Sequence, residues 1–132
     1  MKETMVSVSL TLIGDDFDLA YVSNTLNILP TYTRNKDEVL GNGRLFGHTE
    51  WGIGTDYEPS HDIGIQIQRI LDTILDKEDT LQTICTECNA QWHILVVIYI
   101  VKGKTPIMIL PKKLISIAAA IEAQIGFDTY VC

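Results

Sequence analysis

The stretch Ile-Gly-Phe-Asp-Thr-Tyr-Val-Cys at residues 125–132 says most about the fold. It places two aromatic side chains and a carboxylate directly after an apolar segment, at an end where most chains fray. Such an end is usually docked, and a docked end often completes a sheet. We therefore predict a closing strand over 127–131, locked by Phe127, with Asp128 and Tyr130 on one face because strand side chains alternate. Gly126 is the predicted C-terminal cap of the preceding helix.

The segment before this end predicts a strand, a turn, a second strand and a helix. Residues 92–101 are rich in β-branched and aromatic side chains, which pleated surfaces favour. Lys102-Gly103-Lys104-Thr105 is typical of a hairpin turn, so residues 106–110 are expected to return as the partner strand. Pro111 suits the first turn of a helix that continues to Ile125.

The start of the chain predicts a strand followed by a helix. Apolar and polar residues alternate over 6–13, which indicates a strand with one buried face. Asp15 or Asp16 is expected to cap the next helix, because a short carboxylate accepts hydrogen bonds from the free N–H groups of a first turn. Pro30 is expected to end that helix.

The middle of the chain predicts a loop, a short strand and two helices. Residues 31–43 are polar and end in Gly-Asn-Gly, whereas 44–51 are expected to form a short strand. Apolar residues recur at helical spacing over 63–75, and Gln66 falls on the face expected to meet water. A second helix is expected over 81–88.

This order predicts an α+β fold for a single domain over 1–132. We expect a single-layer, mostly antiparallel sheet of about five strands, with helices packed mainly on one face. The strand over 92–101 is apolar on both faces. Its second face carries Leu95, Val97, Tyr99 and Val101. Covering these side chains would contribute roughly 1.5–3 kcal/mol each, so we expect another element or a second subunit to cover them.

Charge is unevenly divided along the chain. The net charge is −7, and residues 15–79 hold thirteen acidic and five basic side chains, whereas 80–132 hold three and four. Lys112-Lys113 is the largest basic cluster, which argues against nucleic acid and against an anionic membrane as partners. An acidic half suits a basic protein partner, because complementary charge speeds encounter. Acidity that only maintains solubility is the alternative.

Nothing at the start of the chain resembles a signal peptide, so we expect a cytoplasmic protein. The odd number of cysteines favours reduced thiols. Cys85 and Cys88 form a Cys-x-x-Cys late in an apolar helix beside Glu87, where a redox pair would lack the helix N-terminus that lowers a thiol pKa. Zinc would need two more ligands. Half-buried structural cysteines are the favoured interpretation, and we expect no metal and no cofactor.

Four features extend over nearly the whole chain in a fixed order. They are the opening strand with Gly14 and its aspartates, the helix into Ile28-Leu29-Pro30-Thr31, the glycine-rich loop leading to Trp51, and the terminal helix into Gly126-Phe127-Asp128-Thr129-Tyr130. Together they resemble the bacterial family called domain of unknown function 4279, whose more specific marks are Leu-x-Pro-Thr and Phe-Asp-x-Tyr. Pro111 departs from the serine-like cap that is usual there. The resemblance implies a small α+β domain from a bacterium, brings no established catalytic residue, and by analogy favours an immunity or binding role.

One polar cluster falls on the predicted strand over 44–51. Arg44, His48 and Glu50 would share a strand face next to Trp51. A base, an acid and a cation in that arrangement would make a polar site. The alternative, an exposed polar face with Trp51 turned into the core, is favoured because catalysis also needs a pocket.

Asp128 and Tyr130 form a second candidate cluster. Asp128 could accept hydrogen bonds from a loop or pair with Lys112 or Arg44, and Tyr130 could anchor a partner, since tyrosine is enriched at interfaces. A structural lock at the chain end is the favoured interpretation.

We rank three functions. The first is a non-enzymatic protein-binding domain, of an immunity type, that presents its acidic half to a basic partner. The second is a small enzyme or ligand-binding domain with a polar site around Arg44, His48, Glu50 and Trp51. The third is a homo-oligomer built on the exposed sheet face.

Overall fold

The computed structural model describes residues 2–132, which form four helices and a six-stranded mixed sheet. The strands are β1 Met5–Gly14, β2 Tyr32–Arg34, β3 Thr49–Gly54, β4 Glu58–Pro59, β5 Ala90–Ile100 and β6 Gln124–Val131. The helices are α1 Leu19–Leu26, α2 Ile63–Thr73, α3 Glu78–Cys88 and α4 Lys112–Ala120. The fold is therefore α+β, as the order of elements predicted.

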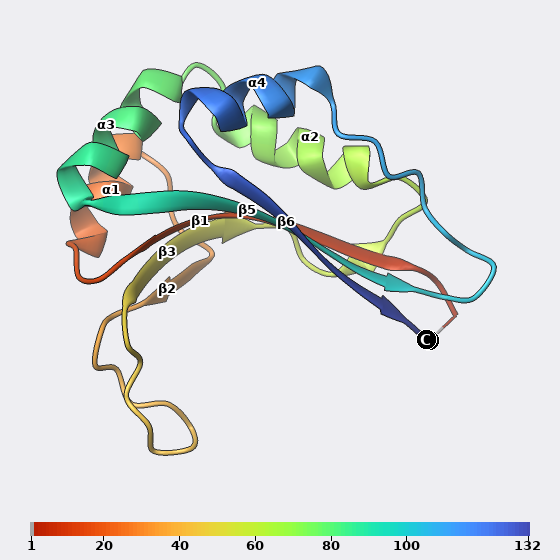
Figure 1. Cartoon of the computed structure of the whole chain (residues 1–132), viewed down its shortest axis with the longest axis horizontal. Coiled ribbons are helices and arrows are strands. Elements are labelled where there is room, and N and C mark those ends of the chain that lie inside the picture. The colour runs from red at the N-terminus through yellow and green to blue at the C-terminus, as the bar shows by residue number, and fades with distance from the viewer. Residues whose placement is uncertain (1) are drawn as a thin grey trace.

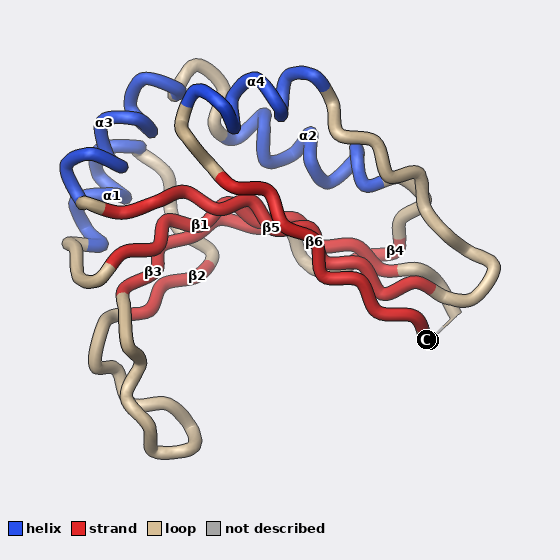
Figure 2. Tube along the Cα trace, viewed as in Figure 1, coloured by secondary structure: helices blue, strands red, loops and turns tan. Residues whose placement is uncertain are grey.

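The sheet has the order β2-β3-β1-β5-β6, and β4 pairs with the first two residues of β1. β1 lies antiparallel to β3, β4 and β5, whereas β6 lies parallel to β5, so the sheet is mostly antiparallel. The helices lie on one side of the sheet, above it in Figure 1, and the tube in Figure 2 shows the strands beneath them. No element within residues 2–132 covers the other side.

The core lies between the sheet and the helices. Alternate residues of the two central strands fill it, namely Val6, Val8, Leu10, Leu12, Trp92, Ile94, Val96 and Ile98. Trp51 and Trp92 are fully buried and meet edge to face, with ring centroids 6.0 Å apart. Trp51 Nε1 donates a hydrogen bond to Ser23 Oγ, and Trp92 Nε1 donates one to the carbonyl of Leu81, both at 2.9 Å. The indole N–H groups are thus satisfied inside the core, as buried indoles require.

The predicted hairpin after β5 is wrong. Within residues 106–110 only Ile107 forms a bridge, and it is an isolated parallel bridge to Asp62. Ile107 N donates to the carbonyl of His61 at 2.8 Å, and Ile63 N donates to the carbonyl of Ile107 at 3.0 Å. These bonds attach the segment to the start of α2 on the helix side, so α4 follows as a crossover and β6 takes the place beside β5. A crossover of this kind is what a parallel pair needs.

The end of the chain is a strand, as predicted, but it begins earlier. α4 ends at Ala120, and Glu122 takes a left-handed conformation with φ 55°. Gly126 therefore lies inside β6 and is not the helix cap, because the turn is made four residues before it. Phe127 is 42% exposed, so the expectation that it locks the chain end in the core is also wrong.

The first helix is capped differently from the prediction. Asp18 is the N-cap, and its Oδ1 accepts hydrogen bonds from the N–H groups of Ala20 and Tyr21 at 2.9 and 3.3 Å. Asp15 and Asp16 lie in the preceding turn, because the helix starts only at Leu19. The helix ends at Leu26, before Pro30.

The boundaries between 31 and 54 also differ. Residues 32–34 form β2 inside the predicted loop, and β3 starts at Thr49 and runs through Gly52 and Gly54. A Cβ at Gly52 would lie 2.8 Å from Thr11 Oγ1, so the close approach of β1 requires glycine there. Residues 35–48 form a projecting loop, which we call the 35–48 loop.

The two predicted helices over 63–75 and 81–88 are confirmed as α2 and α3, with one polar exception. Gln66 is buried rather than exposed. Its Nε2 donates to Glu58 Oε1 and its Oε1 accepts from Ser60 Oγ, both at 2.9 Å. The segment before α2 folds back over this side chain. The periodicity of the helix sequence cannot predict such a contact with another segment.

Candidate functional site

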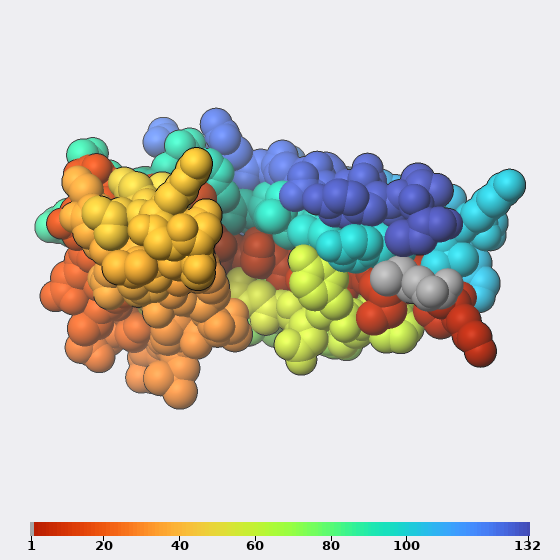
Figure 3. Space-filling model, turned by 90° about the horizontal axis from the view of Figure 1, so that it is seen from below, coloured from red at the N-terminus to blue at the C-terminus, as the bar shows by residue number. Residues whose placement is uncertain are grey.

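The side of the sheet without helices, here called the open face, carries three of the predicted site residues, Glu50, Asp128 and Tyr130. Strand alternation and the pairing register place the following side chains on it: Tyr32, Arg34, Glu50, Ser7, Ser9, Thr11, Ile13, His93, Leu95, Val97, Tyr99, Asp128 and Tyr130. Its middle is lined by small serine, threonine and glycine residues. Figure 3 looks onto this face, with the 35–48 loop rising at the left and β6 along the top. The face is therefore low in the middle and raised at the end formed by the loop.

Part of the expected apolar area on this face is already covered by neighbouring side chains. Val97 is buried, and Leu95, Tyr99 and Val101 are half-buried, although no helix or strand lies over them within residues 2–132. The expectation that another element covers them is wrong for this part of the chain. The second-subunit version stays a prediction.

A hollow of about 280 Å³ lies on the open face between β3, β1, β5 and β6. Glu50 stands at its β3 side and His93 at its β5 side, with Thr11 of β1 between them and Leu95 next to His93 on β5. Gly126 lines the β6 side, and a Cβ there would sit 3.7 Å from Leu95 Cδ1. The hollow thus combines a carboxylate, an imidazole and a hydroxyl over a partly apolar floor, which is the composition of a small-ligand site.

His48 and Glu50 meet at the rim of this hollow, as the sequence indicated. The two side chains lie with His48 Nε2 3.3 Å from Glu50 Oε2. The Glu50 side chain is only 17% exposed, and the Phe46 ring packs on His48 with centroids 4.5 Å apart. This pair can share a proton or form an ion pair when the imidazole is protonated.

The structure does not bring Arg44 to this pair. Arg44 lies in the 35–48 loop before β3 begins, so the period-two spacing from His48 does not apply to it. Arg34 of β2 faces Glu50 in the strand ladder instead. The alternation of the Tyr-Thr-Arg segment could have indicated a strand that places Arg34 here. Three residues, however, are too few to distinguish a strand from a loop.

Arg34 is held by contacts on several sides. Its Nη1 donates to Glu38 Oε2 at 2.9 Å, and its guanidinium lies 5.9 Å from the Tyr32 ring centroid and 5.6 Å from that of Phe46. Interaction with Tyr32, and then with Glu38, raises the pKa of the Arg34 guanidinium. The Glu38 carboxylate therefore neutralises much of this charge.

Trp51 is in the core, as the favoured alternative predicted. It is fully buried between α1 and Trp92 and does not reach the open face. Asp128 and Tyr130 do share the open face. Within residues 2–132, Asp128 forms no ion pair with Lys112 or Arg44.

Three tyrosines, here called the tyrosine row, cross the open face at the end away from the 35–48 loop. Tyr57 meets Tyr99 with centroids 5.6 Å apart, and Tyr99 stacks on Tyr130 at 4.9 Å with 16° between the ring planes. Desolvation raises the pKa of the Tyr57 hydroxyl, with smaller contributions from Tyr99, Tyr130 and Asp128. Tyr57 and Tyr130 remain exposed, so both can contact a partner.

Cys85 and Cys88 are free and half-buried, as expected for structural cysteines. Cys85 Sγ donates to the carbonyl of Ala90 at 2.8 Å, and burial raises the pKa of both thiols. A raised pKa leaves little thiolate at neutral pH, which disfavours redox chemistry. No three His, Cys, Asp or Glu side chains in the described part of the chain are placed to hold a metal ion.

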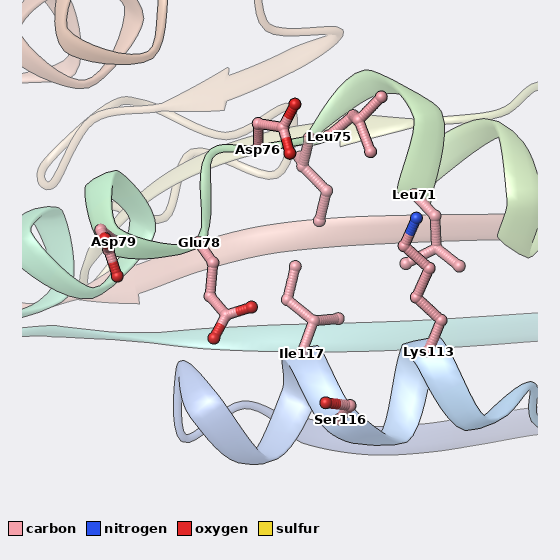
Figure 4. Close-up of a pocket in the computed structure, with 9 residues that line it drawn as sticks. Leu71, Leu75, Asp76, Glu78, Asp79, Lys113, Ser116 and Ile117 are labelled. Carbon is pink, nitrogen blue, oxygen red and sulfur yellow. The ribbon is translucent and has the colours of Figure 1, made fainter.

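A second concave surface lies on the helix side, between α2, the turn that follows it, and α4 (Figure 4). This groove has a volume of about 560 Å³ and an apolar floor that includes Leu71, Ile74 and Ile117. The turn after α2 and the first turn of α3 supply carboxylates at one end, and Lys113 of α4 stands at the other. The carboxylates belong to Asp76, Glu78 and Asp79. It holds three carboxylates and one lysine, and the sequence analysis named no residue in it as a candidate site residue.

The family model named Domain of unknown function (DUF4279) matches residues 3–132. The chain belongs to this family. No curated protein and no solved structure matches it. No helix among residues 2–132 is long and apolar enough to cross a membrane.

The two sequence marks of the DUF4279 resemblance lie at opposite edges of the sheet. Leu29 is almost fully exposed, and the N–H of Thr31 donates to the carbonyl of Gly52 at 2.9 Å where the chain enters β2. Phe127 to Tyr130 forms the body of β6. Neither mark supplies a side chain with a titratable group to the hollow, so the hollow and the family marks are separate features of this DUF4279 chain.

Proposed function

We propose that this DUF4279 protein is a non-enzymatic protein-binding domain that seats a basic partner on its open face. The observation that supports this most is the one-sided placement of the helices, which leaves a concave sheet face free over β2, β3, β1, β5 and β6. Immunity proteins, which hold a toxic partner inactive, are the specific form that the family analogy favours.

The residue types on the open face suit such a partner. Tyrosines are enriched in protein interfaces, and Tyr57 and Tyr130 are exposed at one end of the face. Two carboxylates face the same side, those of Glu50 and Asp128, whereas Arg34 there is paired with Glu38. A partner with exposed lysine or arginine side chains would meet this charge favourably.

The test uses the immobilised protein and the product of the gene next to its own. We expect co-purification that weakens as salt is raised, and that is lost in the double variant Tyr57→Ala, Tyr130→Ala. The matched comparison is Leu75→Ala, which removes an exposed apolar side chain from the helix-side groove. Equal retention by the double variant and the wild type would refute the open face as the binding site, and loss only in Leu75→Ala would assign binding to the groove.

A second function is favoured by one specific observation, the contact of His48 with the half-buried Glu50 at the rim of the hollow. A carboxylate in one hollow with the Ser9 and Thr11 hydroxyls would take a small hydroxylated amine. Glu50→Gln should then abolish the thermal stabilisation that such amines give, whereas Arg44→Ala, which lies away from the hollow, should not. Stabilisation that survives Glu50→Gln would remove this alternative.

A further inference from the structure

The two edges of the sheet are protected very differently. The β2 edge is three residues long and passes directly into the 35–48 loop. The β6 edge is eight residues long, Gln124–Val131, with no proline or lysine and a single charge at Asp128. Natural proteins protect edge strands with short length, charge, proline or bulges, because unpaired edges join other chains. β6 has almost none of these protections.

The backbone of β6 is available for further pairing. The N–H of Cys132 donates to the carbonyl of Ile100 at 2.8 Å, so the even-numbered residues of β6 point toward β5. Because strand residues alternate, the odd-numbered ones direct both N–H and C=O away from the sheet. These are Ile125, Phe127, Thr129 and Val131. No strand lies beyond them within residues 2–132.

Apolar side chains accompany this open edge. Phe127 and Val131 are on the helix side of β6 and are 42% and 77% exposed. The outward residues of α4, which lies on the same side of the molecule as β6, are uncharged after its first turn (Figures 1 and 3). They are Ile115, Ser116 and Ala119. The outward residues of α3, in contrast, include several carboxylates.

The distribution of charge indicates what can pair there. Residues 15–79 carry a net charge of −8, and this excess lies in residues 15–18, before α1, and in residues 55–79, because residues 31–54, which hold β2 and β3, have three acidic and three basic side chains. Residues 80–132, which hold β5, α4 and β6, carry +1. A second copy of this chain also carries −7, and it meets little repulsion at the near-neutral β6 edge. A basic partner would gain nothing from that neutral edge, which favours a second copy as its occupant.

We propose that two copies of the chain pair antiparallel along β6 and form one continuous sheet. A register centred on Phe127 pairs Gln124–Tyr130 of both copies and exchanges about six backbone hydrogen bonds. It sets Phe127 against Phe127 of the second copy and Asp128 against Gly126 of the second copy. A register centred on Asp128 would oppose two carboxylates and is disfavoured.

The test is the oligomeric state of the purified protein alone, measured by sedimentation equilibrium over a concentration series. Thr129→Pro removes an outward N–H while the bonds from β6 to β5 remain, so it should weaken dimerisation at least about tenfold. Thr129→Val keeps the N–H and should dimerise as the wild type does. A monomeric wild type, or a Thr129→Pro protein that dimerises normally, overturns the proposal.

A second pair of variants covers the case in which Thr129→Pro does not fold. Phe127→Glu and Phe127→Lys each place like charges opposite one another at the two-fold axis, so each should be monomeric alone, and their mixture should form a heterodimer. Dimers of either variant alone, or a mixture that stays monomeric, would overturn the β6 interface. Tyr57→Ala should leave the dimer intact, and its loss in that variant would move the interface to the open face. None of these outcomes depends on partner binding, so failure here leaves the proposed function untouched.

Discussion

Replacing Gln66 by alanine is expected to destabilise the protein strongly, although a helical periodicity places this residue in water. The side chain is 1% exposed and bonds Glu58 and Ser60 at 2.9 Å each. Losing a hydrogen bond contributes about 0.5–1.5 kcal/mol, and about 1.5–3 kcal/mol when the partner is charged. One buried methylene adds about 0.8 kcal/mol. Because Glu58 keeps its ion pair with Arg69, we take the lower part of the sum, about 3–4 kcal/mol.

The assay is urea denaturation followed by tryptophan fluorescence, since Trp51 and Trp92 are fully buried and report on the core. Thermal unfolding should agree, with a fall of about 3–5 °C per kcal/mol for a chain of this size, or about 9–20 °C. The matched control is Gln68→Ala on the same helix. Gln68 is exposed and donates to Asp72 at 2.8 Å, so its loss should change stability by at most about 0.5 kcal/mol.

The comparison of the two glutamine variants tests whether Gln66 is buried, as in the structure, or exposed, as the helical periodicity predicts. If Gln66→Ala and Gln68→Ala lose the same small stability, Gln66 faces water and the packing of β4 on α2 described above is wrong. A large loss in Gln66→Ala that Gln66→Met restores would instead assign the effect to packing volume, and the two hydrogen bonds would contribute little.

Other substitutions and reagents test separate parts of the structure. Trp51→Phe should lower the free energy of unfolding by about 1–3 kcal/mol in urea, because it removes part of an aromatic contact and one hydrogen bond, and binding at the open face should be unchanged. Iodoacetamide at neutral pH should alkylate the exposed Cys132 before Cys85 and Cys88, whose raised pKa leaves less thiolate; equal rates by mass spectrometry would contradict this. Ending the chain after Gly126 removes most of β6 and should lower the melting temperature, whereas unchanged melting would show that β6 adds little to stability.

The elements that the sequence predicted well are those whose signal is local. Alternation over 6–13 and the apolar run over 92–101 became β1 and β5, because both strands use one face for the core and lie at the centre of the sheet. The helix over 63–75 followed from an apolar stripe that packs on β1. The periodicity of each segment was sufficient because its neighbours did not change which side was buried.

The elements that it missed depend on contacts made by distant residues. Lys102-Gly103 begins a real turn, with Lys104 N donating to the carbonyl of Val101 at 2.8 Å, but a turn does not determine where the following chain goes. Residues 106–110 follow the start of α2 because His61 and Ile63 offer backbone partners there. The parallel pairing of β6 with β5 follows from this path of the chain, and no local sequence pattern predicts it.

The same distinction explains the candidate site. His48 and Glu50 are two residues apart, so their meeting could be predicted from sequence. Arg34 and His93 reach the open face near Glu50 only through the ladders that join β2 to β3 and β5 to β1. A site assembled across four strands can be predicted only when the strand order is known. The sequence predicted only the approximate number of strands.

The fold determines where the unevenly divided charge of the chain lies in the molecule. The near-neutral residues 80–132 supply β5 and β6 at one edge of the sheet, whereas the acidic excess of residues 15–79 lies in residues 15–18 and 55–79, outside β2 and β3. Pairing through β6 would then set two open faces side by side. A basic partner with two equivalent sites would bind such a dimer more tightly than it binds one copy, because the second contact is intramolecular. If dimerisation and partner binding are both found, Thr129→Pro should therefore weaken the binding of a two-site partner while leaving the affinity of each single site unchanged.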